Sequence, residues 1–207
     1  MIERLVDDIR ASGSNVFDLT LVRGGEWEHD TIIPTAPCQN NFSVTKSYIA
    51  TGIGLLQDMG MLSVEDPILK FFKKDELPAG MDPKMEQIRV RHLLNQTMGL
   101  GEGFLFESDR YTHGTDNWLA YTLSQPLAYE PGTRFTYSNS HFYLLSCIIH
   151  RVSGLTAEWF LRKYLFAPLG IEDYVFASCP MGETQGGTGL YLSTADNAKF
   201  GVLYLNN

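Results

Sequence analysis

The stretch from Ser43 to Gly60 restricts the possible folds more than any other part of this chain. Its spacing predicts a helix, and apolar residues occupy most faces of it: Ile49, Ile53, Leu55, Leu56 and Met59. A helix that is apolar on most faces belongs inside a protein. We therefore expect a buried helix at the centre of the fold. Ser43 would lie at its tip, which is a rigid position for a functional group.

The same helix start carries a hydroxyl and an amine three residues apart. Ser43 and Lys46 would lie one turn apart on one face, close enough to touch. A serine becomes a nucleophile when a base removes its proton, and a lysine is a base when burial lowers its pKa. This pattern favours an acylation site. Taken alone, the pair also fits a helix N-terminal serine beside a solvated lysine.

The residues before this helix predict an amphipathic helix and a β-hairpin. Apolar residues recur at helical spacing in residues 1–12, and residues 16–22 and 27–33 read as two strands joined by a tight turn at Gly24-Gly25. A two-stranded hairpin is marginally stable in water, and no further strand is predicted after the helical middle of the chain. Either the first and last helices cover the hairpin, or polypeptide outside this sequence completes the sheet.

The rest of the chain reads as mainly helical. Residues 62–169 show short helical patterns and no clear strand, with an apolar helix over 140–152 and another over 156–165. Residues 182–189 are rich in glycine, and a last helix runs from 193 to 205. We expect an α/β (α+β) chain in three parts: a helix and hairpin (1–34), a helical domain (35–186), and a glycine-rich segment with the last helix (187–207).

Composition excludes several classes of function. The 207 residues are 44% hydrophobic, enough for a globular core, and the net charge of -8 with no basic run excludes a nucleic-acid surface. No apolar run approaches the roughly 20 residues that a membrane-spanning helix needs. The acidic start does not resemble a signal peptide, so a cytoplasmic location is expected, and an exported mature form also fits. Cys38, Cys147 and Cys179 suggest neither a disulfide framework nor a zinc site, and we expect the latter two to be buried thiols.

A second group of candidate residues precedes the apolar helix at 140–152. Tyr137-Ser138-Asn139 combines a phenol, which transfers a proton when an ammonium lowers its pKa, with an amide that could hold a substrate carbonyl or amide. Taken alone, Tyr137 also fits a core aromatic residue. His141 follows closely and could be proposed as a base, although helix packing explains it as well. No dinucleotide or phosphate-binding loop and no metal-ligand spacing occurs, so neither a cofactor nor a metal ion is predicted.

Together these motifs resemble the serine beta-lactamase and penicillin-binding-protein superfamily, in the branch with class C beta-lactamases, D-alanyl-D-alanine carboxypeptidases and esterases. Ser43 to Lys46 matches its Ser-x-x-Lys motif, and Tyr137 to Asn139 its Tyr-x-Asn motif. Four flanking segments agree in family order: 90–100, 130–133, 169–171 and 189–196.

The resemblance implies a beta-lactamase/transpeptidase-like fold and acyl transfer through Ser43, with Lys46 and Tyr137 catalytic and Asn139 in contact with the substrate. A lactam, a D-Ala-D-Ala peptide and an ester all remain open as substrates. Family members usually continue with further strands, the first of which carries a third motif and one oxyanion donor. We read Gly187-Thr188-Gly189 as the family's glycine-rich loop instead of that motif. The sheet would then be incomplete, and a catalytically silent binding or scaffolding relic, or copies that associate to cover the hairpin, are alternatives.

Overall fold

The computed structural model describes residues 2–109 and 112–206, which fold as helices and short antiparallel strands. The α-helices are α1 (Ile2–Ser12), α2 (Thr45–Asp58), α3 (Val90–Leu94), α4 (Trp118–Leu123), α5 (Asn139–Ser153), α6 (Ala157–Leu161) and α7 (Thr194–Leu205). The strands are β1 (Asp18–Arg23), β2 (Glu26–Thr31), β3 (Gln39–Asn40), β4 (Val175–Phe176) and β5 (Leu190–Leu192). Short 3₁₀ turns cover Phe42–Val44, Ile68–Phe71, Lys74–Glu76 and Pro83–Gln87, and a π-helical turn covers Arg162–Phe166.

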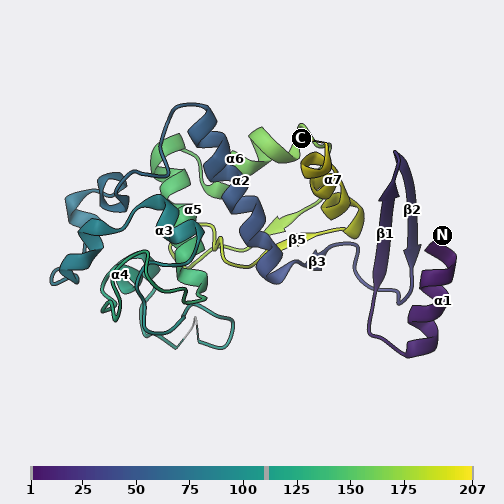
Figure 1. Ribbon diagram of the computed structural model, residues 1–207, viewed down its shortest axis with the longest axis horizontal. Helices are drawn as coiled ribbons and strands as arrows, with labels where there is room; N and C mark the ends of the chain where they lie inside the picture. The colour runs from purple at the N-terminus through teal and green to yellow at the C-terminus, as the bar shows by residue number, and fades with distance from the viewer. Residues whose placement is uncertain (1, 110–111, 207) are drawn as a thin grey trace.

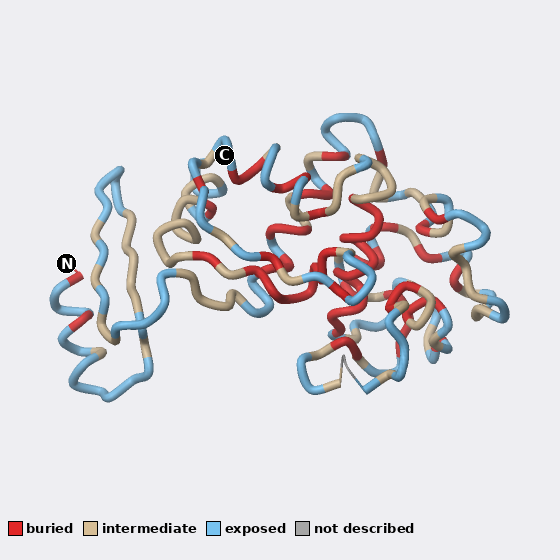
Figure 2. The backbone as a smooth tube through the Cα atoms, turned by 180° about the vertical axis from the view of Figure 1, so that it is seen from behind, coloured by how far each residue is buried: buried red, intermediate tan, exposed pale blue. Residues whose placement is uncertain are grey.

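The core forms where α2 packs against α5, as the apolar patterns of both helices predict. Residues 139–149 of α5 are all buried, and the buried part of the tube in Figure 2 centres on these two helices. Gly52 lets them approach closely, because a Cβ there would lie 3.0 Å from Ile149 Cδ1 and 3.3 Å from Leu161 Cδ2. The buried helix expected from the sequence is therefore confirmed as the centre of the fold.

The N-terminal hairpin lies at one end of the molecule between two helices (Figure 1). Strands β1 and β2 pair antiparallel, with Leu19 opposite Asp30, and α7 contacts β1 while α1 contacts β2. Every residue of the two strands is half-buried or exposed. No third strand pairs with β1 or β2 among residues 2–109 and 112–206. The first and last helices thus pack against the hairpin, as one of the two predicted alternatives requires, but they cover it only in part.

The prediction that no strand follows the helical middle is wrong. Strands β3, β5 and β4 form a separate three-stranded antiparallel sheet in that order, beside α2 (Figure 1). Two or three residues are too few to show the alternation by which a strand is recognised in a sequence. The sheet fixes the chain on both sides of the helical middle, because β3 immediately precedes the Ser43 turn and β5 leads into α7.

Several local predictions are confirmed with shifted ends. Thr156 and Ser193 accept capping bonds from the N–H groups of Trp159 and Asp196, at the starts of α6 and α7. Cys147 and Cys179 are free and buried. No helix within the described residues is both long and apolar enough to cross a bilayer. The division of the chain at residues 34 and 186 stays a prediction.

Candidate active site

Ser43 lies on a 3₁₀ turn in front of α2 and not on the α-helix itself. The turn is held from outside: Asn41 N–H donates to Leu190 O of β5 over 2.8 Å, and the amides of Asn41 and Asn197 exchange two hydrogen bonds. Phe42 has φ of +42°, a conformation that costs free energy for a bulky residue, and its N–H donates to Asn40 Oδ1 over 2.8 Å. The sheet and α7 therefore present an exposed Ser43 hydroxyl on a strained, well-anchored turn.

Lys46 reaches back from the first turn of α2 to the serine. Its ammonium donates to Ser43 Oγ over 3.2 Å, and to Asn139 Oδ1 and Gly187 O over 2.6 Å each. An ammonium has three protons, so these three acceptors use all of them. The side chain is only 7% exposed, which excludes the solvated lysine that the sequence left open.

Tyr137 approaches the serine from the segment that leads into α5. Its hydroxyl lies 2.5 Å from Ser43 Oγ, and Lys46 Nζ lies 4.8 Å from the centre of its ring. The ring is 41% exposed and lies parallel to that of Phe106, with 6.2 Å between centroids. Tyr137 is therefore a surface residue at the serine and not the core aromatic of the alternative interpretation.

The electrostatics of the two groups are coupled. Burial lowers the pKa of Lys46, while Tyr137 beside it acts in the opposite direction. Burial alone would raise the pKa of Tyr137, but the hydrogen bond to Ser43 and the neighbouring Lys46 ammonium outweigh it, so this pKa lies below its ordinary value. Both pKa values thus lie below their ordinary values, so each group loses its proton more readily than it would in water.

Asn139 is the first residue of α5 and is buried. Its Oδ1 accepts the bond from Lys46, and its Nδ2 donates to Leu105 O over 3.0 Å. The preceding residue, Ser138, caps the helix and also bonds both backbone groups of Phe104 at 3.1 Å. In this arrangement Asn139 holds the amine of Lys46 in place, and a substrate would have to replace Leu105 O to reach the amide.

Two glycines complete the site, and sequence reasoning missed the part they play. A Cβ on Gly187 would lie 2.7 Å from Asn139 Cβ, and only a residue without one lets the Gly187 carbonyl reach Lys46. A Cβ on Gly103 would overlap the Tyr137 carbonyl oxygen and lie 2.9 Å from the Phe106 ring. The run of glycines at 186–189 was the available signal, since glycine marks close backbone approach.

His141 takes no part in this group. It is fully buried in α5, its Nε2 has no hydrogen-bond partner among the residues that the structure describes, and burial lowers its pKa to about 4. The imidazole is thus neutral and sealed from solvent, as helix packing requires. Among residues 2–109 and 112–206, no group of three His, Cys, Asp or Glu side chains could hold a metal ion.

The arrangement brings Ser43, Lys46, Tyr137 and Asn139 to one place, which is the geometry that a hydroxyl nucleophile requires. An oxygen within hydrogen-bond reach of both an amine and a phenol can lose its proton as it attacks a carbonyl carbon. Lys46 and Asn139 lie in the first turns of α2 and α5, the two helices of the core, and Ser43 and Tyr137 lie just before these helices.

Comparison with known proteins places this geometry in a family context. The Beta-lactamase family profile matches residues 38–206. Penicillin-binding protein 4* of Bacillus subtilis (strain 168) is 31% identical over 137 residues, 63% of this chain and 29% of that protein. A putative D-alanyl-D-alanine carboxypeptidase of Salmonella agona (strain SL483) is 23% identical, over 86% of this chain and 43% of that protein.

The solved structures agree on the fold. The octameric penicillin-binding protein homologue from Pyrococcus abyssi aligns with a TM-score of 0.73 and 22% identity, over 99% of this chain and 55% of that one. The chain therefore spans less than half the length of the two curated relatives and about half that of the solved structure.

Proposed function

The chain belongs to the Beta-lactamase family, whose members and fold are those of serine hydrolases, and on this premise we propose that it is a serine acyl-hydrolase with Ser43 as the acylated residue. The observation that carries the proposal is the position of Ser43 Oγ, 3.2 Å from Lys46 Nζ and 2.5 Å from the Tyr137 hydroxyl. A lactam, a D-Ala-D-Ala peptide and an ester each present the carbonyl that this chemistry needs.

In the proposed acylation the Lys46–Tyr137 pair starts one proton short, with Tyr137 as a phenolate beside the Lys46 ammonium. Ser43 Oγ attacks the carbonyl carbon, and its proton passes to the phenolate oxygen. The lowered pKa of both groups supports this transfer, because a base works best when its pKa lies near the working pH. The pair then returns the proton to the leaving nitrogen or oxygen. In the second half of the reaction, water attacks the acyl carbon and passes a proton to the pair. The pair then protonates Ser43 Oγ as the bond between the serine and the acyl group breaks.

Asn139 supports the reaction chiefly as a positioning residue for Lys46, through the bond to its Oδ1. Its contact with a substrate amide stays a prediction, since its Nδ2 would first exchange Leu105 O for the substrate. The Ser43 N–H, at the N-terminal end of the turn and of α2, is the proposed oxyanion donor. Removal of one such donor typically costs about 100- to 1000-fold in turnover, so this N–H would contribute strongly to the proposed acylation rate.

Intact-mass labelling tests the proposal. The protein is incubated with a penicillin and, separately, with a fluorophosphonate, beside the Ser43→Ala variant as the matched control. One adduct per chain on the parent protein, absent from Ser43→Ala, supports the hydrolase. The second candidate, a catalytically silent scaffold, is favoured by the two-stranded hairpin, whose half-exposed strands lack a third partner among the described residues. It predicts no adduct at any reagent concentration.

We also propose that copies of the chain associate through this hairpin. Association would cover strands that α1 and α7 leave half exposed, and a solved relative is described as octameric. Sedimentation or light scattering checks the solution mass against the 23.3 kDa of one chain. A mass of one chain across a wide concentration range would contradict the association.

A further inference from the structure

We propose that Glu183 is a positioning residue for Lys46. Its carboxylate is held at the C-terminal end of α5, and the segment that it anchors carries the Gly187 carbonyl, which accepts a hydrogen bond from the Lys46 ammonium at the other end of α5. This inference rests on the proposed function, in which Lys46 takes part in the proton transfer from Ser43. Glu183 is the only charged residue of the glycine-rich segment 182–189.

The Glu183 carboxylate is bound by two neighbouring side chains of α5. Arg151 Nη1 donates to Glu183 Oε1 over 2.6 Å, and His150 Nδ1 lies 2.9 Å from Glu183 Oε2. Arg151 is held in turn by Glu76 Oε1, through Nε at 3.0 Å and Nη2 at 2.6 Å. The Glu183 side chain is only 12% exposed, and charge-assisted bonds away from water are stronger than surface ion pairs. The segment therefore begins at a firm anchor.

The segment that follows Glu183 runs antiparallel along α5 and touches it at two further points. A Cβ on Gly186 would overlap the carbonyl oxygen of Phe142, and a Cβ on Gly187 would lie 2.7 Å from Asn139 Cβ. The contacts thus move from the last turn of α5 to its first residue. Glycine at these two positions lets the backbone lie directly on the helix.

The segment has no slack between its two ends. Four residues of extended chain, from Glu183 to Gly187, reach at most about 13–14 Å. Asn139 and His150 are eleven residues apart in α5, a rise of about 16–17 Å. The long Glu183 side chain covers the difference by reaching back to His150. A movement of this carboxylate away from α5 would therefore displace the Gly187 carbonyl, because no loose residues lie between them to absorb it.

Backbone hydrogen bonds hold the same segment from another side. Cys179 N–H donates to Glu183 O over 2.8 Å, and Gln185 N–H donates to Ala177 O over 3.0 Å. These bonds join the segment to the chain that follows β4. They leave its distance from α5 to the glycine contacts and to the Glu183 carboxylate, and the bond to the amine depends on that distance.

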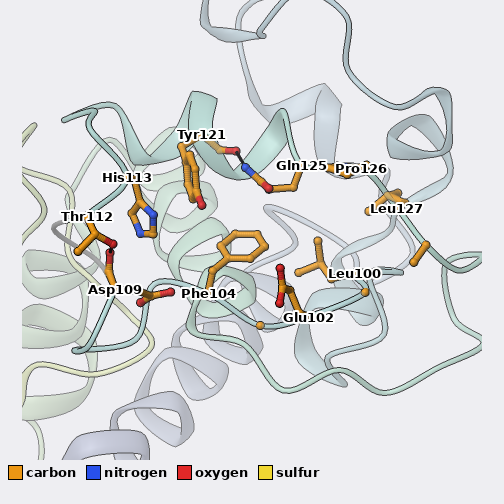
Figure 3. Close-up of a pocket in the computed structure, with 13 residues that line it drawn as sticks. Leu100, Glu102, Phe104, Asp109, Thr112, His113, Tyr121, Gln125, Pro126 and Leu127 are labelled. Carbon is orange, nitrogen blue, oxygen red and sulfur yellow. Dashed lines mark hydrogen bonds between the residues drawn. The ribbon is translucent and has the colours of Figure 1, made fainter.

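The second support of Lys46 is backed by a loop and not by a helix. Asn139, which accepts from the amine, donates to Leu105 O over 3.0 Å. The neighbouring Phe104 borders a pocket together with Tyr121 of α4 (Figure 3). A loop beside a pocket has fewer packed neighbours and yields more easily than a segment pressed on a helix. The Gly187 carbonyl is thus the firmer of the two supports.

NMR of the Lys46 ammonium tests the proposal without relying on acylation. Ammonium protons held in hydrogen bonds exchange slowly with water, so the side chain gives its own signal, assigned by its loss in Lys46→Arg. In Glu183→Ala we expect these protons to exchange about tenfold faster or more, since a hydrogen bond to a charged group is worth at least that factor. The acylation rate at saturating reagent should fall by about 10- to 100-fold, because small displacements of a reacting group cost that much.

Glu76→Ala is the matched control. Glu76 and Glu183 are both carboxylates bound to Arg151, but Glu76 lies on a 3₁₀ turn outside the glycine-rich segment. Its loss should lower stability in urea unfolding to a comparable extent and leave Lys46 exchange and acylation near the parent values. Glu183→Gln keeps the length of the side chain and loses its charge. It should change both rates in the same direction by less, and it remains the test if Glu183→Ala does not fold.

The outcomes separate this proposal from the proposed function. Equal changes of Lys46 exchange in Glu183→Ala and Glu76→Ala would make Glu183 a stabilising residue only and overturn the proposal. An exchange rate unchanged in both Glu183 variants would overturn it as well. Faster exchange in the Glu183 variants alone, with no adduct on the parent protein, would support the positioning of Lys46 and count against the hydrolase.

Discussion

Replacement of Tyr137 by Phe removes a single oxygen atom, the one that lies 2.5 Å from Ser43 Oγ. The ring keeps its place beside Phe106, and at 41% exposed it leaves no cavity behind. The free energy of unfolding should therefore change by less than about 0.5 kcal/mol. Loss of a positioned proton-transfer group should slow acylation by about 100- to 10,000-fold. The separation of these two effects makes the variant informative.

The assay is the rate constant of adduct formation, followed by intact mass at saturating reagent between pH 6 and 10. In the parent protein the rate should rise with pH and level off below pH 10, because the pKa of Tyr137 lies below its ordinary value of 10.0. In Tyr137→Phe, the remaining increase of the rate with pH should occur at lower pH. Tyr137 raises the pKa of Lys46, so without its hydroxyl only the effect of burial, which lowers that pKa, would remain. Acylation of the variant within about threefold of the parent, well short of the loss expected for a proton-transfer group, would refute the assignment. Tyr129→Phe, at a half-buried tyrosine outside the site, is the matched control.

Three further predictions concern the framework of the site. Gly187→Ala should destabilise the protein by about 1–3 kcal/mol in urea unfolding and abolish acylation, because the new methyl group meets Asn139 at 2.7 Å; Gly201→Ala, with open space at its Cβ, is the control and should be neutral or stabilising. Ile53→Ala empties part of the core at a residue 1% exposed and should cost about 2–5 kcal/mol; a loss under about 1 kcal/mol would contradict the central place given to α2. The pKa of Glu76 is lowered, because hydrogen bonds from Arg151 and from the Lys73 backbone outweigh the effect of burial. The ionised carboxylate therefore stabilises the folded protein above its ordinary pKa of 4.5. This stabilisation is lost as the pH falls through the pKa of the folded state. In Arg151→Met, the free energy of unfolding should fall less steeply as the pH is lowered below 4.5. An unchanged pH dependence would show that the 2.6 Å Arg151–Glu76 ion pair does not lower the pKa of Glu76.

The long elements could be predicted because each carries a regular apolar pattern. Helices α2 and α5 are apolar over many turns, and the hairpin shows alternation with a Gly-Gly turn, so their positions follow from periodicity. The sheet of β3, β5 and β4 could not be predicted, because its strands span only two or three residues and β3 pairs with β5 across more than 150 positions of sequence. Such pairing is decided by tertiary packing, which local patterns do not record.

The side chains of the candidate site were predicted and its backbone partners were not. Ser43, Lys46, Tyr137 and Asn139 belong to spaced motifs with reactive side chains, which a sequence displays directly. The carbonyls of Gly187 and Leu105, which hold Lys46 and Asn139, belong to groups that every residue possesses. Only the backbone course of the two loops brings these oxygens to the site. The turn at Phe42 likewise depends on a strained φ that no residue preference predicts.

The bond between Lys46 and the carbonyl of Gly187 joins positions 141 residues apart. During synthesis, α2 and α5 would therefore be able to meet well before the amine has its last acceptor. A nascent chain that ends ahead of residue 187 would carry a serine with an undocked amine beside it and remain inert towards acylating reagents. The rate at which Ser43 is acylated would then measure when the glycine-rich loop packs against the start of α5 during folding.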